Sequence, residues 1–394
     1  MGLRATYWHN LSLDGAIVAD MAEYARTVRF DEASGIITVE SGMTLRDLDR
    51  SMRSRGYQLE MYPDAYGDTF VGSGIANGVT AGRGMLRGSF LDQVVGFELM
   101  LADGATVQVG ASRMAQDAAG GIGTGIPDLR SIVFGAEGAL GVITEIDFAL
   151  TPAAWQCEID WKTDDDRFEE VLALASRFRR SDVIDTLRWA WDGIGALTMF
   201  VSSRLDATEL DHRIATLSAA FPAWPAPSVV RHGDEHRAGR GDAYDRTWGG
   251  RPGQTWERAA RSPFFGIDFF VPYGEARGAW AWARALELEG IAGKRVAGYF
   301  GRDGVNIGVH CVSEAARRDE VRTALEARIV DLAAFRAIPY RVGRVWRDAF
   351  MARMDPTTRL ALSNIARQLD PDAVMNPGVG VFGRGHNGGT EQTR

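Results

Sequence analysis

Between Pro63 and Gly88 the chain reads DAYGDTFVGSGIANGVTAGRGMLRG, and this glycine-dense stretch constrains the fold more than any other part of the sequence. The number of glycines predicts that no regular helix or strand forms here, while the apolar residues are too many for a flexible linker. Because glycine has no side chain, its backbone can approach another surface closely. The segment therefore predicts a loop whose backbone lies against a ligand.

Strand and helix signals precede this segment. The runs at 16–21, 25–30 and 36–41 predict three strands, the last two joined by a tight turn. A helix is predicted from Thr44, which can cap its first turn with Asp47 three residues later, to Gly56, which closes it. The N-terminal region therefore mixes strands with a helix.

The strand pattern resumes after the glycine-rich segment. Residues 94–110 predict a hairpin that turns at Asp103-Gly104, and residues 140–150 predict another strand before Pro152. From there to about residue 350, helical patterns alternate with strand-like runs, which favours an antiparallel sheet covered by helices. The helical patterns lie at 168–178, 207–221, 278–290 and 314–335, and the strand-like runs at 155–163, 197–205, 264–273 and 305–312. The predicted fold class is α+β.

The composition excludes several classes of partner. The chain has 394 residues, 45% of them apolar, with a net charge of −8, so we expect a globular protein that binds neither nucleic acid nor an anionic membrane. The two cysteines, Cys157 and Cys311, are too few for a disulfide framework, and no secretory signal or membrane span is evident. These features predict a cytoplasmic location.

Three local motifs admit more than one interpretation. GSGIANG at 72–78 resembles a dinucleotide fingerprint, but the glycines that follow would break the helix that such a fingerprint requires. HGDEH fits the inverted zinc-peptidase pattern with His232, Glu235 and His236, although the neighbouring glycines and prolines favour a polar loop, part of a long exposed loop over 231–254. His310 is either a core histidine or a contact to a cofactor.

The order of several segments carries a family resemblance. ITVESGMTLRDLDRSMRSRGYQLEMYPD, TFVGSGIANG, RGSFLDQVVGFELMLADG and FGAEGALGVITEIDFALTP together resemble the PCMH-type FAD-binding domain of the vanillyl-alcohol oxidase/4-cresol dehydrogenase superfamily. PYR at 339–341 and LDPDAVMNPG at 369–378 resemble its substrate cap and closing segment. The resemblance implies an FAD-binding domain at 1–152 completed by 355–383, a cap domain at 153–354 and a disordered tail at 384–394.

The resemblance also implies which residues hold the FAD. The loops at 72–78, 89–95 and 138–143 would approach the flavin and the rest of the cofactor through their backbone, with Asn376 in the closing segment. The expected cofactor-binding residues are Gly72, Ser73, Gly74, Ile75, Ala76, Asn77, Ser89, Asp92, Val95, Gly138, Gly141, Val142, Ile143 and Asn376. No metal is expected.

Tyr340 and Arg341 are the expected substrate residues, because a Tyr-Arg pair binds the phenolate oxygen in the phenol-oxidising branch of this superfamily. A guanidinium and a phenol can both donate hydrogen bonds to an anion, and a carboxylate would satisfy them equally. The alternative is structural, with Tyr340 packed and Arg341 paired with an acid such as Asp348. Asn77 is a further catalytic candidate, near the position where that branch can place an acidic residue.

The resemblance implies transfer of a hydride from an alcohol, phenol or hydroxy acid to flavin N5, and a homodimer that takes a small-molecule substrate. Two features depart from the family pattern. Val379 follows the closing Pro-Gly where the phenol-oxidising branch commonly has lysine, and the chain begins inside or just after the usual first diphosphate loop, so the domain is expected to be N-terminally incomplete. The alternatives are a remnant that has lost its flavin and acts as a binding protein, or a zinc hydrolase built on HGDEH.

Overall fold

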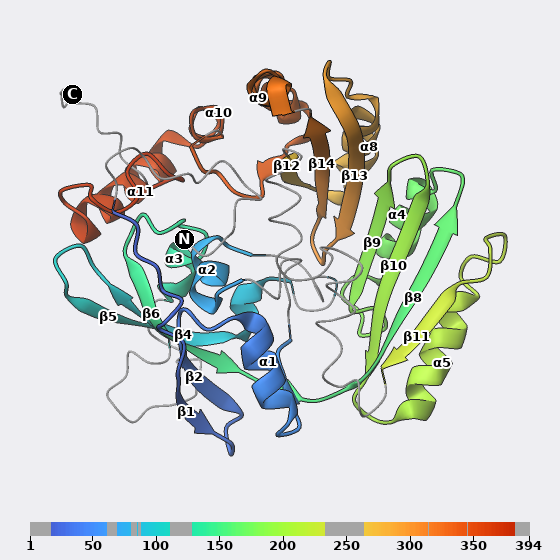
Figure 1. Cartoon of the computed structure of the whole chain (residues 1–394), viewed down its shortest axis with the longest axis horizontal. Helices are drawn as coiled ribbons and strands as arrows, with labels where there is room; N and C mark the ends of the chain where they lie inside the picture. The colour runs from blue at the N-terminus through green and yellow to red at the C-terminus, as the bar shows by residue number, and fades with distance from the viewer. Residues whose placement is uncertain are drawn as a thin grey trace.

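Two β-sheets, at the left and right of Figure 1, organise the chain. The computed structural model describes residues 17–60, 69–79, 85, 88–110, 128–232, 264–313, 315–344 and 346–382. Within these ranges all named strand pairs are antiparallel, and helices lie beside both sheets. The α+β fold class predicted from the sequence is confirmed.

The first sheet has the strand order β1-β2-β6-β4-β5 in the described part of the chain. Its hairpins β1–β2 and β4–β5 lie where the sequence predicted them, with Gly104 at a φ of 84° in the second turn. The predicted strand at 16–21 is wrong, because residues 17–21 form no strand. The strands are β1 (Thr27–Asp31), β2 (Ile36–Glu40), β4 (Val94–Met100), β5 (Thr106–Gly110) and β6 (Val142–Ala149), with the separate pair β3 (Tyr57–Gln58) and β7 (Thr151–Pro152).

Helix α1 (Leu45–Arg53) forms as its capping residues predicted. The Thr44 hydroxyl accepts a hydrogen bond from the Asp47 backbone N–H at 3.1 Å, which satisfies a donor that the first turn leaves unpaired. Leu45, Leu48 and Met52 face the core, and Gly56 adopts a φ of 82° three residues after the helix ends.

The sequence predicted no regular structure in the glycine-rich segment between Pro63 and Gly88, and this prediction is wrong for the middle of the segment. Residues Val71–Ala76 form the short helix α2, although two of its six residues are glycine. Close packing explains this exception: a Cβ on Gly72 would lie 2.7 Å from the Ser41 Cβ, and one on Gly74 would lie 3.1 Å from the Phe90 ring. Gly78, at a φ of 59°, follows the end of the helix.

The second sheet has the order β11-β8-β10-β9-β13-β14-β12-β15 among the described residues. Helices α4 (Phe168–Phe178), α5 (Ala207–Ser218), α8 (Ala276–Ala285) and α9 (Arg318–Ala327) lie within the predicted helical patterns or overlap them, and their apolar sides join the core of this sheet. The predicted antiparallel sheet covered by helices is therefore observed. Its strands are β8 (Trp155–Thr163), β9 (Thr186–Trp191), β10 (Gly195–Ser203), β11 (Ser228–His232), β12 (Phe264–Val271), β13 (Ile291–Phe300), β14 (Val305–Ser313) and β15 (Ile338–Pro339).

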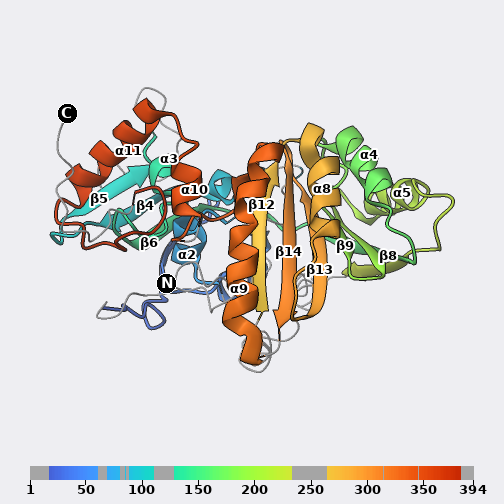
Figure 2. The same cartoon turned by 90° about the horizontal axis from the view of Figure 1, so that it is seen from above.

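The last described segment returns to the first sheet. After β15 pairs with β12, the chain forms α10 (Arg347–Met351) and α11 (Pro356–Leu369), and Figure 2 shows α11 above the first sheet. Ala366 and Phe382 belong to the same buried apolar cluster as the strands of that sheet. The domain limits predicted from the sequence stay predictions, as does the disordered tail, which lies outside the described residues.

Across the ranges that the structure describes, no helix combines the length and apolar character needed to cross a membrane.

Candidate functional site

The second sheet has an apolar face and a polar face. Along each strand, side chains of the helix-covered core alternate with polar ones, for example Val305 and Ile307 on either side of Asn306. The polar side chains are nevertheless buried, so another part of the protein must cover this face. Its buried polar residues include Glu158, Thr186, Arg188, Thr198, Ser202, Asp268 and Asn306.

One row of directly paired residues runs across this polar face from β8 to β12. At one end, the Thr198 hydroxyl donates to Asp160 at 2.7 Å, and further along, the Arg188 guanidinium lies 5.5 Å from the centre of the Tyr299 ring. Burial raises the pKa of Asp160 in spite of its hydrogen bonds. The row consists of Asp160, Thr198, Arg188, Tyr299, Asn306 and Phe270.

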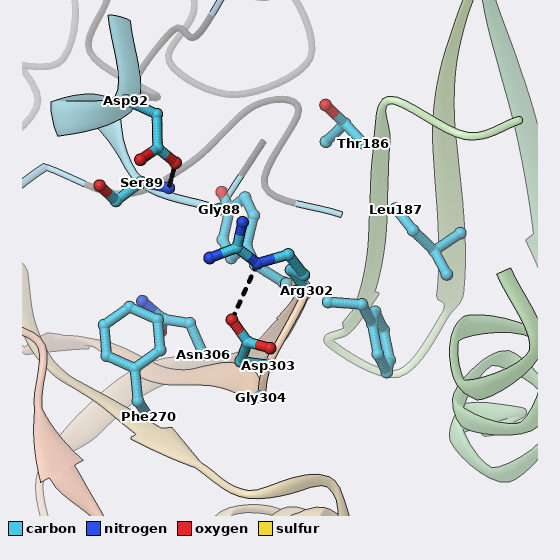
Figure 3. Close-up of a pocket in the computed structure, with 13 residues that line it drawn as sticks. Gly88, Ser89, Asp92, Thr186, Leu187, Phe270, Arg302, Asp303, Gly304 and Asn306 are labelled. Carbon is cyan, nitrogen blue, oxygen red and sulfur yellow. Dashed lines mark hydrogen bonds and ion pairs between the residues drawn. The ribbon is translucent and has the colours of Figure 1, made fainter. Parts of the chain in front are cut away.

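A cavity of about 260 Å³ lies between this polar face and the segment that leads into β4 (Figure 3). Gly88, Ser89 and Asp92 form the wall from the first part of the chain. The opposite wall comes from the second sheet and its β13–β14 turn, and it is made by Thr186, Leu187, Phe270, Tyr299, Phe300, Gly301, Arg302, Asp303, Gly304 and Asn306. Sequence positions about two hundred residues apart therefore face one space.

Arg302 brings the β13–β14 turn across to the first part of the chain. Figure 3 shows its side chain between Asp303 and the Gly88–Ser89 segment. Gly88 has a φ of 94°, which favours glycine, and a Cβ there would lie 2.8 Å from the guanidinium carbon, so the Arg302 side chain packs directly on this backbone. Arg302 donates to Asp303 at 2.9 Å; this bond lowers the Asp303 pKa and raises that of Arg302.

Ser89 and Asp92, both predicted to contact the cofactor, line the cavity. They also cap the short 3₁₀-helix η2 (Phe90–Gln93): the Ser89 hydroxyl accepts from the Leu91 N–H at 3.1 Å, and Asp92 accepts from the Ser89 N–H at 3.0 Å. These bonds fix the wall between the cavity and the first sheet.

The predicted glycines lie mostly against the protein itself. A Cβ on Gly138 would lie 2.8 Å from the Asn376 amide nitrogen, and one on Gly141 would lie 2.6 Å from the Met100 carbonyl oxygen. Gly72 and Gly141 therefore have too little room for a Cβ because of internal packing, while Gly74 and Gly138 are packed closely against the Phe90 ring and the Asn376 side chain. Of the other predicted residues, Ile75 and Ile143 belong to the core, Val95 and Val142 lie in β4 and β6, and Ser73, Ala76 and Asn77 lie at α2.

Glu137 joins three predicted segments. Its backbone N–H donates to the Ala76 carbonyl at 2.7 Å, and its buried carboxylate accepts from the Val342 and Gly343 N–H groups at 2.9 Å each. The Asn376 side chain donates to the Glu137 carbonyl at 2.6 Å. The end of α2, the loop before β6 and the closing segment are thus held together by one residue that the sequence analysis did not identify.

Tyr340 and Arg341 lie beside the cavity wall. The Tyr340 ring packs edge-on against Phe270, with ring centres 5.7 Å apart, and the Arg341 guanidinium lies 4.9 Å from the centre of the Tyr340 ring. Arg341 is 6% exposed. Phe270 lines the cavity, so the pair adjoins the cavity wall through this contact without lining it. Asn77, whose amide donates to the Ser73 carbonyl at 2.9 Å, caps α2.

His310 pairs with Asp268 on the polar face, with Nε2 3.2 Å from a carboxylate oxygen. A Cβ on Gly308 would overlap the Asp268 carboxylate, and one on Gly266 would lie 2.6 Å from the His310 ring. The two glycines make room for the pair, so the His310 ring is satisfied by Asp268, as expected for a core histidine, and a contact of His310 with the cofactor stays a prediction.

The zinc-hydrolase alternative finds no support. Its pattern needs a helix, yet His232 is the last residue of strand β11, while Glu235 and His236 lie outside the described residues. The exposed loop predicted at 231–254 also falls largely outside them. In the part of the chain described here, no group of three or more His, Cys, Asp or Glu side chains is arranged to hold a metal ion.

Comparison with known proteins assigns the first part of the chain. Residues 4–110 match the FAD binding domain family. An uncharacterized FAD-linked oxidoreductase of Mycobacterium tuberculosis is 22% identical over 94% of this chain and 82% of its own length. The chain is an FAD-linked oxidoreductase with a PCMH-type FAD-binding domain. Its cofactor is FAD, as predicted, and the prediction of an FAD-dependent enzyme is confirmed.

Other relatives match shorter regions. A probable D-2-hydroxyglutarate dehydrogenase of rice is 28% identical over 35% of this chain and 23% of its own length. The glycolate oxidase subunit GlcD of Bacillus subtilis is 29% identical over 35% of this chain and 28% of its own length. The solved structure of alkyldihydroxyacetonephosphate synthase superposes with a TM-score of 0.62 at 14% identity, covering 91% of this chain and 66% of that one, which supports the fold alone.

The residues around the cavity fit the ring end of FAD or a small substrate. Asn306 lines the cavity, and its buried carboxamide oxygen has no hydrogen-bond partner among the described residues, so this amide is available to a polar-edged ligand. Pockets that enclose a drug-sized ligand measure about 300–1,000 Å³. At about 260 Å³ the cavity can hold a ring or a substrate but not a whole dinucleotide.

Asn306, Phe270 and Tyr299 were not identified from the sequence. Each belongs to a strand, and only the register between β12, β14 and β13 makes them neighbours. The available signal was the alternation of Val305, Ile307 and Val309 with Asn306 and His310, which marks a polar residue on an otherwise apolar strand.

Proposed function

We propose that this FAD-dependent oxidoreductase oxidises a small hydroxyl-bearing molecule, which is an alcohol, a phenol or a hydroxy acid. The names of the rice and Bacillus relatives support oxidation of a hydroxy compound. Their alignments cover about a third of this chain, so they support the class of reaction more than any particular substrate.

The observation that carries this proposal is the cavity between Ser89 and Asp92 on one side and the polar face of the second sheet on the other. One wall therefore belongs to the FAD-binding region and the other to a sheet with polar and aromatic side chains. A substrate there lies between the cofactor-binding region and residues that can orient its hydroxyl group.

The chain's own residues would orient the substrate and stabilise charge. FAD, when bound, supplies the acceptor for the hydride. Phe270 and Tyr299 exclude water from the cavity, and the Asn306 amide binds a polar group of the substrate. Neither Tyr340 nor Arg341 lines the cavity, but the Arg341 guanidinium is buried beside the Tyr340 ring that packs on Phe270, so its charge would act on the substrate oxygen from behind this wall.

The narrower assignments belong to the same proposal. The Tyr340-Arg341 pair supports membership of the vanillyl-alcohol oxidase superfamily. A homodimer is supported only by the resemblance of the sequence to that superfamily. A cytoplasmic location is supported by two buried, unpaired cysteines in the described structure. Size-exclusion chromatography with light scattering tests the dimer.

The experiment is anaerobic reduction of the purified FAD-loaded protein by a panel of primary alcohols, para-substituted phenols and 2-hydroxy acids. We expect at least one class to bleach the visible absorption of the oxidised flavin within a catalytic time. If dithionite reduces the flavin but no member of the panel does, the proposal is wrong.

A further inference from the structure

Asn306 has a buried polar group that no described part of the protein uses. The residue is 7% exposed, and its carboxamide oxygen has no hydrogen-bond partner among the described residues. Several other buried polar atoms in the described structure also lack a partner, but Asn306 is the residue among them that lines this cavity. Because buried polar groups in folded proteins are almost always hydrogen-bonded, a ligand in the cavity is the natural partner for this amide.

Aromatic rings stand on both sides of Asn306. The register places Phe270 directly opposite it on β12 and Tyr299 directly opposite it on β13, and all three line the cavity. Figure 3 labels Phe270 and Asn306. Two strand spacings separate positions 270 and 299 by roughly 10 Å. A flat group in contact with a ring on each side needs about 7–8 Å, so it fits between them with its edge at Asn306.

The charges in the cavity wall compensate one another. Among the lining residues, Arg302 is the cation, while Asp303 and Asp92 are carboxylates. Arg302 donates to Asp303, and both carboxylates contribute to its raised pKa. Among the residues that line the cavity, the one cation is therefore already paired with a carboxylate, and Asp92 is a second carboxylate in the wall. Arg341 lies behind Phe270 and does not line the cavity, so it can stabilise charge that develops during the reaction but cannot pair directly with a substrate carboxylate there.

We propose that Asn306 is a specificity-determining residue, and that it selects an uncharged, flat substrate by hydrogen bonding to its polar group between Phe270 and Tyr299. This inference deepens the proposed function and rests on it: within alcohols, phenols and hydroxy acids, uncharged aromatic alcohols are the preferred class. A carboxamide both donates and accepts, so it can bind a hydroxyl or a carbonyl group.

The test uses a pair of ligands with the same shape and different charge. Benzamide and benzoate are titrated into the full-length FAD-loaded protein, and binding is followed by the change in flavin absorption and by calorimetry. Both ligands can hydrogen-bond to the Asn306 amide, but only benzoate is repelled by Asp92 and Asp303, so we expect benzamide to bind at least about tenfold more tightly than benzoate. If the wild-type protein binds benzoate as tightly as benzamide, or more tightly, the inference is wrong, and no variant is needed to show it.

A substitution tests the residue itself. Asn306→Leu keeps the approximate size and removes both hydrogen-bonding groups, so we expect the Kd for benzamide to rise about tenfold. Ser313→Ala is the matched control: Ser313 lies on the same strand, and its buried hydroxyl also lacks a partner among the described residues, but it does not line the cavity. Unchanged benzamide binding in Asn306→Leu with a full complement of FAD, or an equal loss in Ser313→Ala, contradicts the inference.

These binding measurements require no turnover, so the two proposals fail separately. If benzamide binds as expected but no hydroxy compound reduces the flavin, the specificity residue stands and the proposed reaction is wrong. If 2-hydroxy acids reduce the flavin readily and benzamide does not bind, the reaction stands and the role of Asn306 is wrong.

Discussion

The two sheets meet their polar and steric requirements in different ways. Around the first sheet, the glycines lie against neighbouring backbone and side chains, as Gly72 does against Ser41 and Gly141 against Met100. On the second sheet, the polar face lines a cavity, and the Asn306 carboxamide oxygen has no hydrogen-bond partner among the residues that the structure describes. The comparison separates residues that build the protein from residues available to a ligand, and glycine content alone does not distinguish the two.

The largest effect is expected at Arg341. Arg341→Ala removes the buried cation beside Tyr340, so we expect turnover of the best substrate to fall about 100-fold, as for loss of a group that stabilises developing charge, while the FAD content changes little. Steady-state kinetics and the flavin-to-protein absorbance ratio measure the two quantities.

Arg336→Ala is the control for this substitution, because Arg336 is exposed and pairs with Glu275 at the surface. It should leave both quantities unchanged. If Arg341→Ala loses FAD but keeps normal turnover per bound flavin, Arg341 binds the cofactor and not the substrate. If both turnover and FAD content equal those of the wild type, Arg341 only packs against its neighbours.

A smaller effect on stability is expected at Gly72. In Gly72→Ala the new Cβ would lie 2.7 Å from the Ser41 Cβ, so we expect the free energy of unfolding of the FAD-free protein to fall by about 2 kcal/mol. Urea denaturation of the FAD-free protein measures this difference.

Gly274→Ala is the matched control, since a Cβ at Gly274 meets nothing within 4 Å and its backbone is not in the left-handed region. It should leave stability unchanged within about 0.5 kcal/mol. If Gly72→Ala leaves the FAD-free protein as stable as Gly274→Ala does but weakens FAD binding, Gly72 serves the cofactor, and the contrast drawn here between the sheets is wrong at that position.

The smallest effect concerns the apolar face of the second sheet, where Cys157 is fully buried. Burial raises the pKa of this thiol from 9.0 to about 12. A raised pKa stabilises the folded state below pH 9, and this contribution is lost as the pH rises from 9 towards 12. Between pH 8 and 10 we expect wild type to lose about 1 kcal/mol more than Cys157→Ala, measured by urea denaturation at each pH. Parallel pH profiles would show that this face is accessible to water.

Local signals in the sequence predicted much of the fold. Thr44, Asp47 and Gly56 defined α1, and the strand pattern with Asp103-Gly104 defined the β4–β5 hairpin, because these features depend on neighbours in sequence. Helix α2 was missed because propensity argues against VGSGIA, while packing against Ser41 and Phe90 favours it.

The candidate site was less accessible to sequence reasoning. Ser89 and Asp92 were expected near the cofactor and line the cavity, whereas Asn306, Phe270 and Tyr299 become neighbours only through strand register. Likewise, nothing local to Glu137 indicates that its carboxylate binds the Val342 and Gly343 N–H groups more than two hundred residues later. Long-range pairing of this kind cannot be obtained from periodicity or turn residues.

The central claim is that the substrate binds on the polar face of the second sheet, opposite the FAD-binding region. A crystal structure of the FAD-loaded protein soaked with benzamide tests it most directly. The account predicts density for the ligand between Phe270 and Tyr299, with its amide within hydrogen-bond distance of Asn306. A cavity filled by the protein's own side chains, with the ligand bound elsewhere, would contradict it.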